Sequence, residues 1–170
     1  MRILQSFLKG IDNLSEWTGK IFNWTVIPLM VLVVMEVIRR KAFNSPTVWS
    51  LEITTFIYGF YFMIVAAYTL LYRGHVSVDI IYNRFSNRGK AIIDIVLYLT
   101  LFFIFIGIGF KGGVGYAASA WELRARSVTA FSPILYPIKT VIPVAVLLLL
   151  LQGLSNFIRS LMLAIKGQNL

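Results

Sequence analysis

The sequence contains four apolar runs that are each long enough to cross a membrane. A spanning helix needs about 20 mostly apolar residues. The runs that meet this requirement are 21–38, 53–72, 91–110 and 140–158. Their apolar residues are continuous rather than alternating, which favours helices over the strands of a membrane barrel. The pattern therefore predicts an all-α integral membrane protein with four transmembrane helices, organised as a single membrane domain over residues 1–170.

Residues 1–20 are amphipathic rather than uniformly apolar. Their apolar residues recur every three or four positions, at Ile3, Leu4, Phe7, Leu8, Ile11 and Leu14. This spacing places one apolar face along a helix. Such a helix suits the headgroup layer of a membrane, and docking onto a partner protein is the alternative.

A second amphipathic segment lies between the second and third spans. Val78, Ile81, Tyr82 and Phe85 share one helical face, which predicts a short helix in the plane of the membrane. The basic residues beside it are candidates for contacts with lipid headgroups. They are Arg84, Arg88 and Lys90.

The composition supports a membrane protein and argues against an enzyme or a metal protein. Hydrophobic residues make up 58% of the chain and charged residues 14%, whereas soluble domains have about 45–50% and about 25%. There is no cysteine and one histidine, His75. Disulfides, Cys-ligated zinc and a haem held between two histidines are therefore excluded within this chain. We expect no cofactor, no metal and no catalytic residue.

The net charge of +9 comes from 16 Lys and Arg against 7 Asp and Glu. In a hydrophobic chain this balance indicates anionic lipid headgroups rather than nucleic acid. Nine of the basic residues lie on the side of the N-terminus and seven on the other. This difference slightly favours cytoplasmic N- and C-termini.

Few residues offer a site of their own. Glu36, Glu52 and Asp94 lie near span ends, where structural pairing, subunit contact and an ion relay all remain open. Gly109, Gly113 and Ala117 form a small-residue ladder, which suits helix packing within the chain or on a separate subunit. The sequence therefore predicts an accessory or scaffold subunit.

Three segments, in this order, resemble a known family. Ser45-Pro46 predicts a helix start, and Trp49-Ser50-Leu51-Glu52 then matches a W-x-x-E motif. The second helix ends in Tyr72–Asp79, which is similar to an R-x-G-x-H-[IV]-x-[VI]-D pattern but one residue shorter between Arg73 and His75. Thr129–Pro133 precedes the fourth span. The chain resembles the small, DctQ-type membrane subunit of tripartite ATP-independent periplasmic (TRAP) transporters.

The resemblance implies a place in the bacterial inner membrane, beside a large TRAP membrane subunit and a periplasmic substrate-binding protein. It implies secondary active transport of an organic acid, with sodium as the usual coupling ion. The large subunit is expected to move like an elevator against a scaffold that this chain enlarges. The sequence does not indicate whether the substrate is a carboxylate, a sulfonate or an acidic sugar.

The resemblance also selects residues. Five positions match the family motifs and are candidate contacts with the large subunit or with lipid: Trp49, Glu52, Arg73, His75 and Asp79. The loops 39–50 and 112–131 are expected to face the periplasm and the binding protein.

Two other functions remain as alternatives. One is a self-associating channel of four-span subunits. The other is an enzyme that acts on lipid at the interface, with His75 and Asp79 as acid and base.

We predict that Glu52→Gln and Arg73→Ala each weaken co-purification with the large subunit and lower uptake, because both change a charged family-motif position at a helix end. Affinity co-purification and uptake assays measure the two effects. Unchanged values for both variants would remove the assignment of these positions to the subunit contact.

Overall fold

The computed structural model describes residues 2–72 and 85–166, which are mainly helical. The elements are α1 (Arg2–Asn23), α2 (Val26–Ala42), α3 (Ser50–Leu71), α5 (Asn87–Leu97), the π-helical turn η1 (Tyr98–Phe102), α6 (Phe103–Glu122) and α7 (Tyr136–Lys166). Four helical stretches are long and apolar enough to cross a membrane: Ile3–Ala42, Ser50–Leu71, Arg88–Glu122 and Tyr136–Ile165. The predicted all-α fold with four spans is confirmed.

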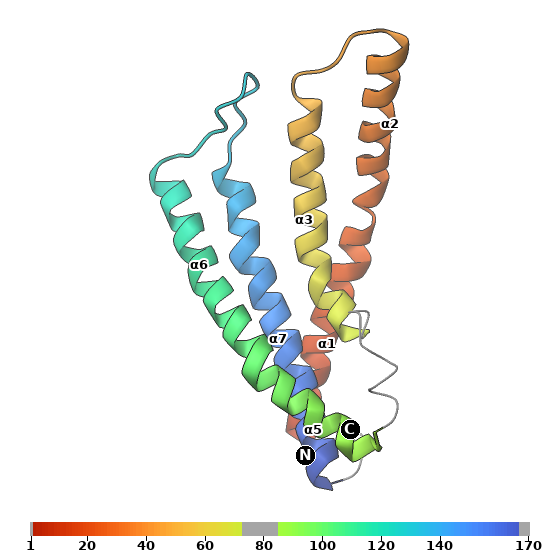
Figure 1. Ribbon diagram of the computed structural model, residues 1–170, viewed down its shortest axis with the longest axis vertical. Coiled ribbons are helices and arrows are strands. Elements are labelled where there is room, and N and C mark those ends of the chain that lie inside the picture. The colour runs from red at the N-terminus through yellow and green to blue at the C-terminus, as the bar shows by residue number, and fades with distance from the viewer. Residues whose placement is uncertain (1, 73–84, 167–170) are drawn as a thin grey trace.

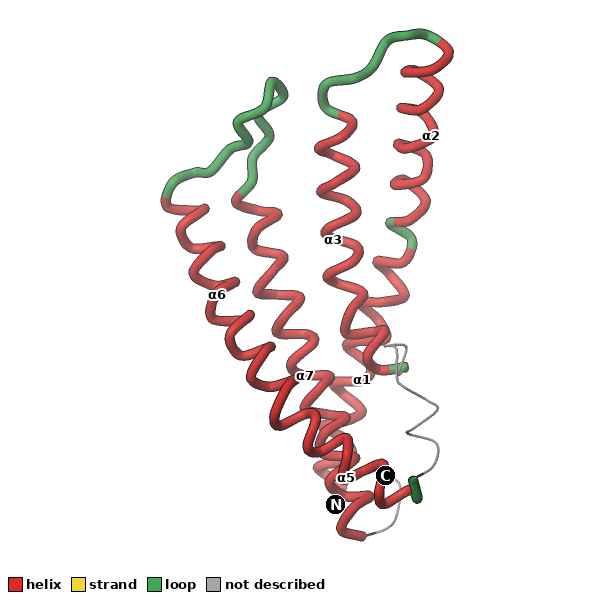
Figure 2. The backbone as a smooth tube through the Cα atoms, viewed as in Figure 1, coloured by secondary structure: helices red, strands yellow, loops and turns green. Residues whose placement is uncertain are grey.

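The spans form two pairs that are close at one end and diverge toward the other (Figure 1). One pair is α2 with α3, and the other is α6 with α7. The loops after α2 and after α6 lie at the divergent end (Figure 2). The beginning of α1 and the end of α7 lie at the opposite end. Helix α7 joins the pairs, because it packs against α1, α3, α5 and α6.

Small residues form the closest helix contacts. A Cβ atom on Gly153 of α7 would lie 2.1 Å from the ring of Phe102 in η1. A Cβ atom on Gly19 of α1 would lie 2.2 Å from the ring of Tyr68 in α3. Ala67 and Ala91 are almost fully buried. Lipid chains are as apolar as the side chains, so close backbone approach holds such helices together.

Helix α1 forms as predicted, and its place in the headgroup layer stays a prediction. It continues through a turn at Trp24–Thr25 into α2 and runs beside α3 and α7 (Figure 1). Leu8 and Ile11 are buried, whereas Ile3 and Phe7 stay exposed. Helix α1 lies beside α7 because polar side chains of α1 form hydrogen bonds with α7.

Two helix boundaries also differ from the sequence pattern. The helix expected from Ser45-Pro46 begins at Ser50, because Thr47 turns back to Glu36: the Thr47 N–H donates to the carboxylate over 3.3 Å, and the hydroxyl donates as well. The third span continues past Lys111 to Glu122, so the loop expected over 112–131 begins only after Glu122.

The short in-plane helix predicted around Val78–Phe85 lies outside the described residues, apart from Phe85. Phe85 is exposed. The next residue, Ser86, is the N-cap of α5, and its hydroxyl accepts a hydrogen bond from the Gly89 N–H over 3.3 Å.

The contact between Gly19 and Tyr68 can be tested on α1 itself. Gly19→Ala is expected to lower the free energy of unfolding by about 1–3 kcal/mol, because the new methyl group would lie 2.5 Å from the Tyr68 Cβ as well as against the ring. The readout is the unfolding midpoint in detergent.

The control is Gly10→Ala on the same helix. A Cβ atom at Gly10 meets nothing within 4 Å, so this substitution should stabilise the helix by about 0.5–1 kcal/mol. Equal midpoints for the two variants would contradict the close crossing of α1 and α3.

Candidate functional site

A buried polar cluster joins α1 to α7. Gln152 and Ser155 of α7 have 0% exposure, and Ser15 of α1 has 1%. The Ser15 hydroxyl donates to the Gln152 Oε1 over 2.7 Å. The Gln152 amide donates to the Asp12 Oδ1 over 3.1 Å, and the Ser155 hydroxyl donates to the same oxygen over 3.2 Å. Each of these buried polar groups therefore has a partner inside the protein.

Arg159 completes the cluster by contacting both carboxylate oxygens of Asp12. Its Nη1 donates to the Oδ1 over 3.3 Å, and its Nη2 pairs with the Oδ2. This two-point geometry suits the planar guanidinium and fixes its direction. The pair is partly exposed, with side-chain exposures of 32% for Arg159 and 18% for Asp12. The negative charge of Asp12 is thereby paired with the positive charge of Arg159.

The cluster extends to α3 through Asn156. Its amide accepts from Gln152 over 3.3 Å and donates to the Leu70 carbonyl over 3.2 Å. Leu70 lies in the last turn of α3, where backbone carbonyls have no partner within the helix. The cluster therefore joins α1, α3 and α7 in one arrangement.

Sequence reasoning missed this cluster because Gln152 lies inside an apolar run. The available signal is spacing. Gln152, Ser155, Asn156 and Arg159 recur every three or four residues, which places them on one face of a helix. A polar face in a span indicates contact with protein rather than lipid.

Two family-motif positions, Trp49 and Glu52, lie at the start of α3. Trp49 precedes the helix and is half-buried, as is Glu52 in the first turn. The Ser127 hydroxyl, from the loop between α6 and α7, donates to the Glu52 Oε1 over 3.4 Å. This contact bridges the two helix pairs at their divergent end. The Glu52 Oε2 is buried and has no hydrogen-bond partner in the described part of the chain.

The other motif positions, Arg73, His75 and Asp79, lie outside the described residues, and so does Arg84. The remaining candidates for headgroup contact are at the beginning of α5. Arg88 is exposed there and Lys90 is half-buried.

The small-residue ladder is divided between two environments. Gly113 and Ala117 are buried, and a Cβ atom on Gly113 would lie 3.2 Å from the side chain of Ile142 in α7. Gly109 is exposed, and a Cβ atom there would meet nothing within 4 Å. Two of the three residues thus lie at the contact between α6 and α7.

The remaining acidic candidates have partners within the chain. Glu36 pairs with Arg40 over 3.1 Å in addition to its bonds with Thr47. The Asp94 Oδ2 accepts from the Ser160 hydroxyl over 3.4 Å. Within residues 2–72 and 85–166, no group of three or more His, Cys, Asp or Glu could hold a metal ion.

Comparisons with known proteins point to one family. The family described as tripartite ATP-independent periplasmic transporters, DctQ component, matches residues 29–163. A relative in Haemophilus influenzae, the sialic acid TRAP transporter permease protein SiaT, is 23% identical over 107 residues. That match covers 61% of this chain and 17% of the relative. The chain therefore spans less than a fifth of that relative's length.

The polar cluster leads to a stability prediction. Asp12→Ala is expected to lower the free energy of unfolding by about 1.5–3 kcal/mol, because it leaves Gln152 and Arg159 without their shared acceptor. Unfolding in detergent by an added denaturant measures the change.

Glu16→Ala is the matched control on α1. Glu16 pairs with Lys20 at the surface, where such pairs contribute about 0–1 kcal/mol. If both variants lost the same stability, the cluster would have no special role in holding α1 to α7.

Proposed function

The chain belongs to the DctQ component family of tripartite ATP-independent periplasmic transporters, and we propose that it works as the scaffold subunit beside a large membrane subunit. The observation that carries this proposal is the family match over residues 29–163. In this role the chain itself does not carry the substrate. It enlarges and steadies the fixed part of the transporter while the large subunit moves its transport domain like an elevator.

The side-chain contacts support a static role. Asp12 and Arg159 neutralise each other, and Glu36 pairs with Arg40. These ionisable groups are engaged in contacts between or within helices, so they are poorly suited to binding and releasing ions. Helix α7 contacts both helix pairs, which resists their separation. A rigid part of this kind can oppose the force of a sliding neighbour.

We propose that both termini face the cytoplasm of a bacterial inner membrane. The loops 43–49 and 123–135 lie at the end of the bundle opposite to the beginning of α1 (Figure 2). They would then face the periplasm, where a substrate-binding protein could reach them. Basic residues at this end offer contacts to acidic groups on that protein. They include Arg39, Arg40, Lys41, Arg124 and Arg126.

The proposed substrate class is an organic acid, taken up by sodium-coupled secondary transport. The support is the relative in Haemophilus influenzae, whose name assigns it to a sialic acid transporter. The family-motif residues Trp49 and Glu52 are proposed to serve the contact with the large subunit or its lipids. Their place at the start of α3, beside the loop residue Ser127, is compatible with such a contact.

Reconstitution tests the proposal. The chain is co-expressed with a TRAP large membrane subunit and a TRAP substrate-binding protein, and uptake of radiolabelled organic acids into proteoliposomes is measured under an inward sodium gradient. We expect co-purification of the two membrane subunits and uptake that requires this chain. Dissipating the gradient with an ionophore should abolish uptake.

The control reaction omits only this chain. Full uptake without it would contradict the scaffold function. A purified homo-oligomer of this chain that conducts ions in liposomes would instead support the self-associating channel.

A further inference from the structure

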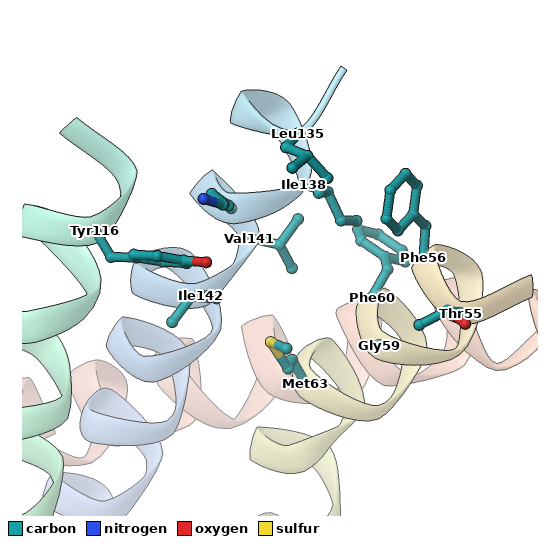
Figure 3. Close-up of a pocket in the computed structure, with 11 residues that line it drawn as sticks. Thr55, Phe56, Gly59, Phe60, Met63, Tyr116, Leu135, Ile138, Val141 and Ile142 are labelled. Carbon is teal, nitrogen blue, oxygen red and sulfur yellow. The ribbon is translucent and has the colours of Figure 1, made fainter. Parts of the chain in front are cut away.

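An apolar groove separates α3 from α7 toward the divergent end of the bundle (Figure 3). Its volume is about 330 Å³. Most of its wall is apolar and comes from both helices: Phe56, Phe60 and Met63 of α3, and Ile138, Val141 and Ile142 of α7. A groove of this kind is a poor site for water, because its lining offers few hydrogen-bond partners.

The polar part of the groove is cationic. Lys139 lines it, and its Nζ lies 4.0 Å from the centre of the Tyr116 ring. No salt bridge to a carboxylate is found for Lys139 within residues 2–72 and 85–166. The hydroxyl of Thr55, which also lines the groove, donates to the Leu51 carbonyl over 2.8 Å. An incoming group would therefore meet a positive charge.

Aromatic side chains of the kind that gather at membrane surfaces lie near Lys139. The Trp121 indole N–H donates to the Thr140 hydroxyl over 2.8 Å, and the Trp121 and Tyr136 rings lie 4.4 Å apart. Trp and Tyr with such polar ends gather where the membrane meets water. Thr140 and Tyr136 flank Lys139 along α7. This arrangement suits a cation at the membrane surface with an apolar wall along the spans.

We propose that this groove binds one anionic phospholipid, with an acyl chain between α3 and α7 and the phosphate at Lys139. The chemistry of the lining favours a lipid, because the apolar wall suits an acyl chain and the single cation, Lys139, suits a phosphate.

The bound lipid would fill the space between the two helix pairs. It would keep them at a fixed separation where they diverge, as α7 does at the other end. The site is distinct from the candidate headgroup contacts Arg88 and Lys90, which lie at the beginning of α5 (Figure 1). It requires the membrane setting but no transport partner, so it can fail or hold independently of the scaffold function.

Native mass spectrometry of the purified chain tests the site. The chain is titrated in detergent with phosphatidylglycerol or with phosphatidylcholine of the same acyl chains. We expect one tightly held lipid and a preference for phosphatidylglycerol of about fivefold, the effect of one Lys near an anionic headgroup.

Gly59→Leu blocks the groove directly. Gly59 lines it, and a Cβ atom there meets nothing within 4 Å, so the new side chain would occupy the space of the acyl chain. We expect loss of the bound lipid. The control is Gly109→Leu, an equally open glycine on α6 that does not line the groove, which should retain it.

Lys139→Gln tests the headgroup separately. It should remove the preference for phosphatidylglycerol while leaving phosphatidylcholine binding unchanged, and Lys111→Gln on α6 is the control for loss of an exposed positive charge. Unchanged lipid binding in Gly59→Leu, or an unchanged preference in Lys139→Gln, would overturn the proposal. If Gly59→Leu kept its lipid but lost the large subunit, the groove would be a protein contact instead.

Discussion

Asp12 occupies a position where a carboxylate without partners would be costly. It lies on α1, half-buried against α7, and it accepts hydrogen bonds from Gln152, Ser155 and Arg159. Removing a charge from water costs several kcal/mol unless partners replace the lost hydration. This requirement accounts for the arrangement of α1, α3 and α7 around Asp12. Helix α1 must lie beside α7 to satisfy Asp12, and Asn156 brings in the end of α3 through the Leu70 carbonyl.

Small residues allow the helices to reach these positions. Gly19 brings α1 against Tyr68 of α3, and Gly153 brings α7 against Phe102. Polar groups and glycines thus act together at the end where α1, α3, α5 and α7 meet. At the other end the helix pairs diverge, and the structure there depends on the loops, through the contact between Ser127 and Glu52. Close packing is concentrated at the end where α1, α3, α5 and α7 meet, and more open surface lies at the other end.

This division suits a subunit that supports a moving neighbour. The end near Asp12 and Arg159 has satisfied polar groups and close packing, so it should resist deformation. The open end offers the apolar groove, the motif residues Trp49 and Glu52, and basic loop residues. Such surfaces can receive lipid and protein partners without rearrangement of the core. The proposed scaffold function and the proposed lipid site would therefore use opposite properties of the same bundle.

The pattern of apolar residues was sufficient to predict the four spans and the helix over residues 1–20. These features depend on the residues nearest in the chain and on the length of the apolar runs, so they can be read locally. The family motifs likewise indicated the start of α3 near Trp49 and Glu52.

The place of α1 could not be read in this way. Asp12 and Arg159 are 147 positions apart in the sequence. Only folding brings them together. The same holds for the groove, whose walls come from α3 and α7 and whose cation lies over a ring of α6. Periodicity assigns a residue to a face of its helix, but the neighbour that covers this face is chosen by packing between distant segments.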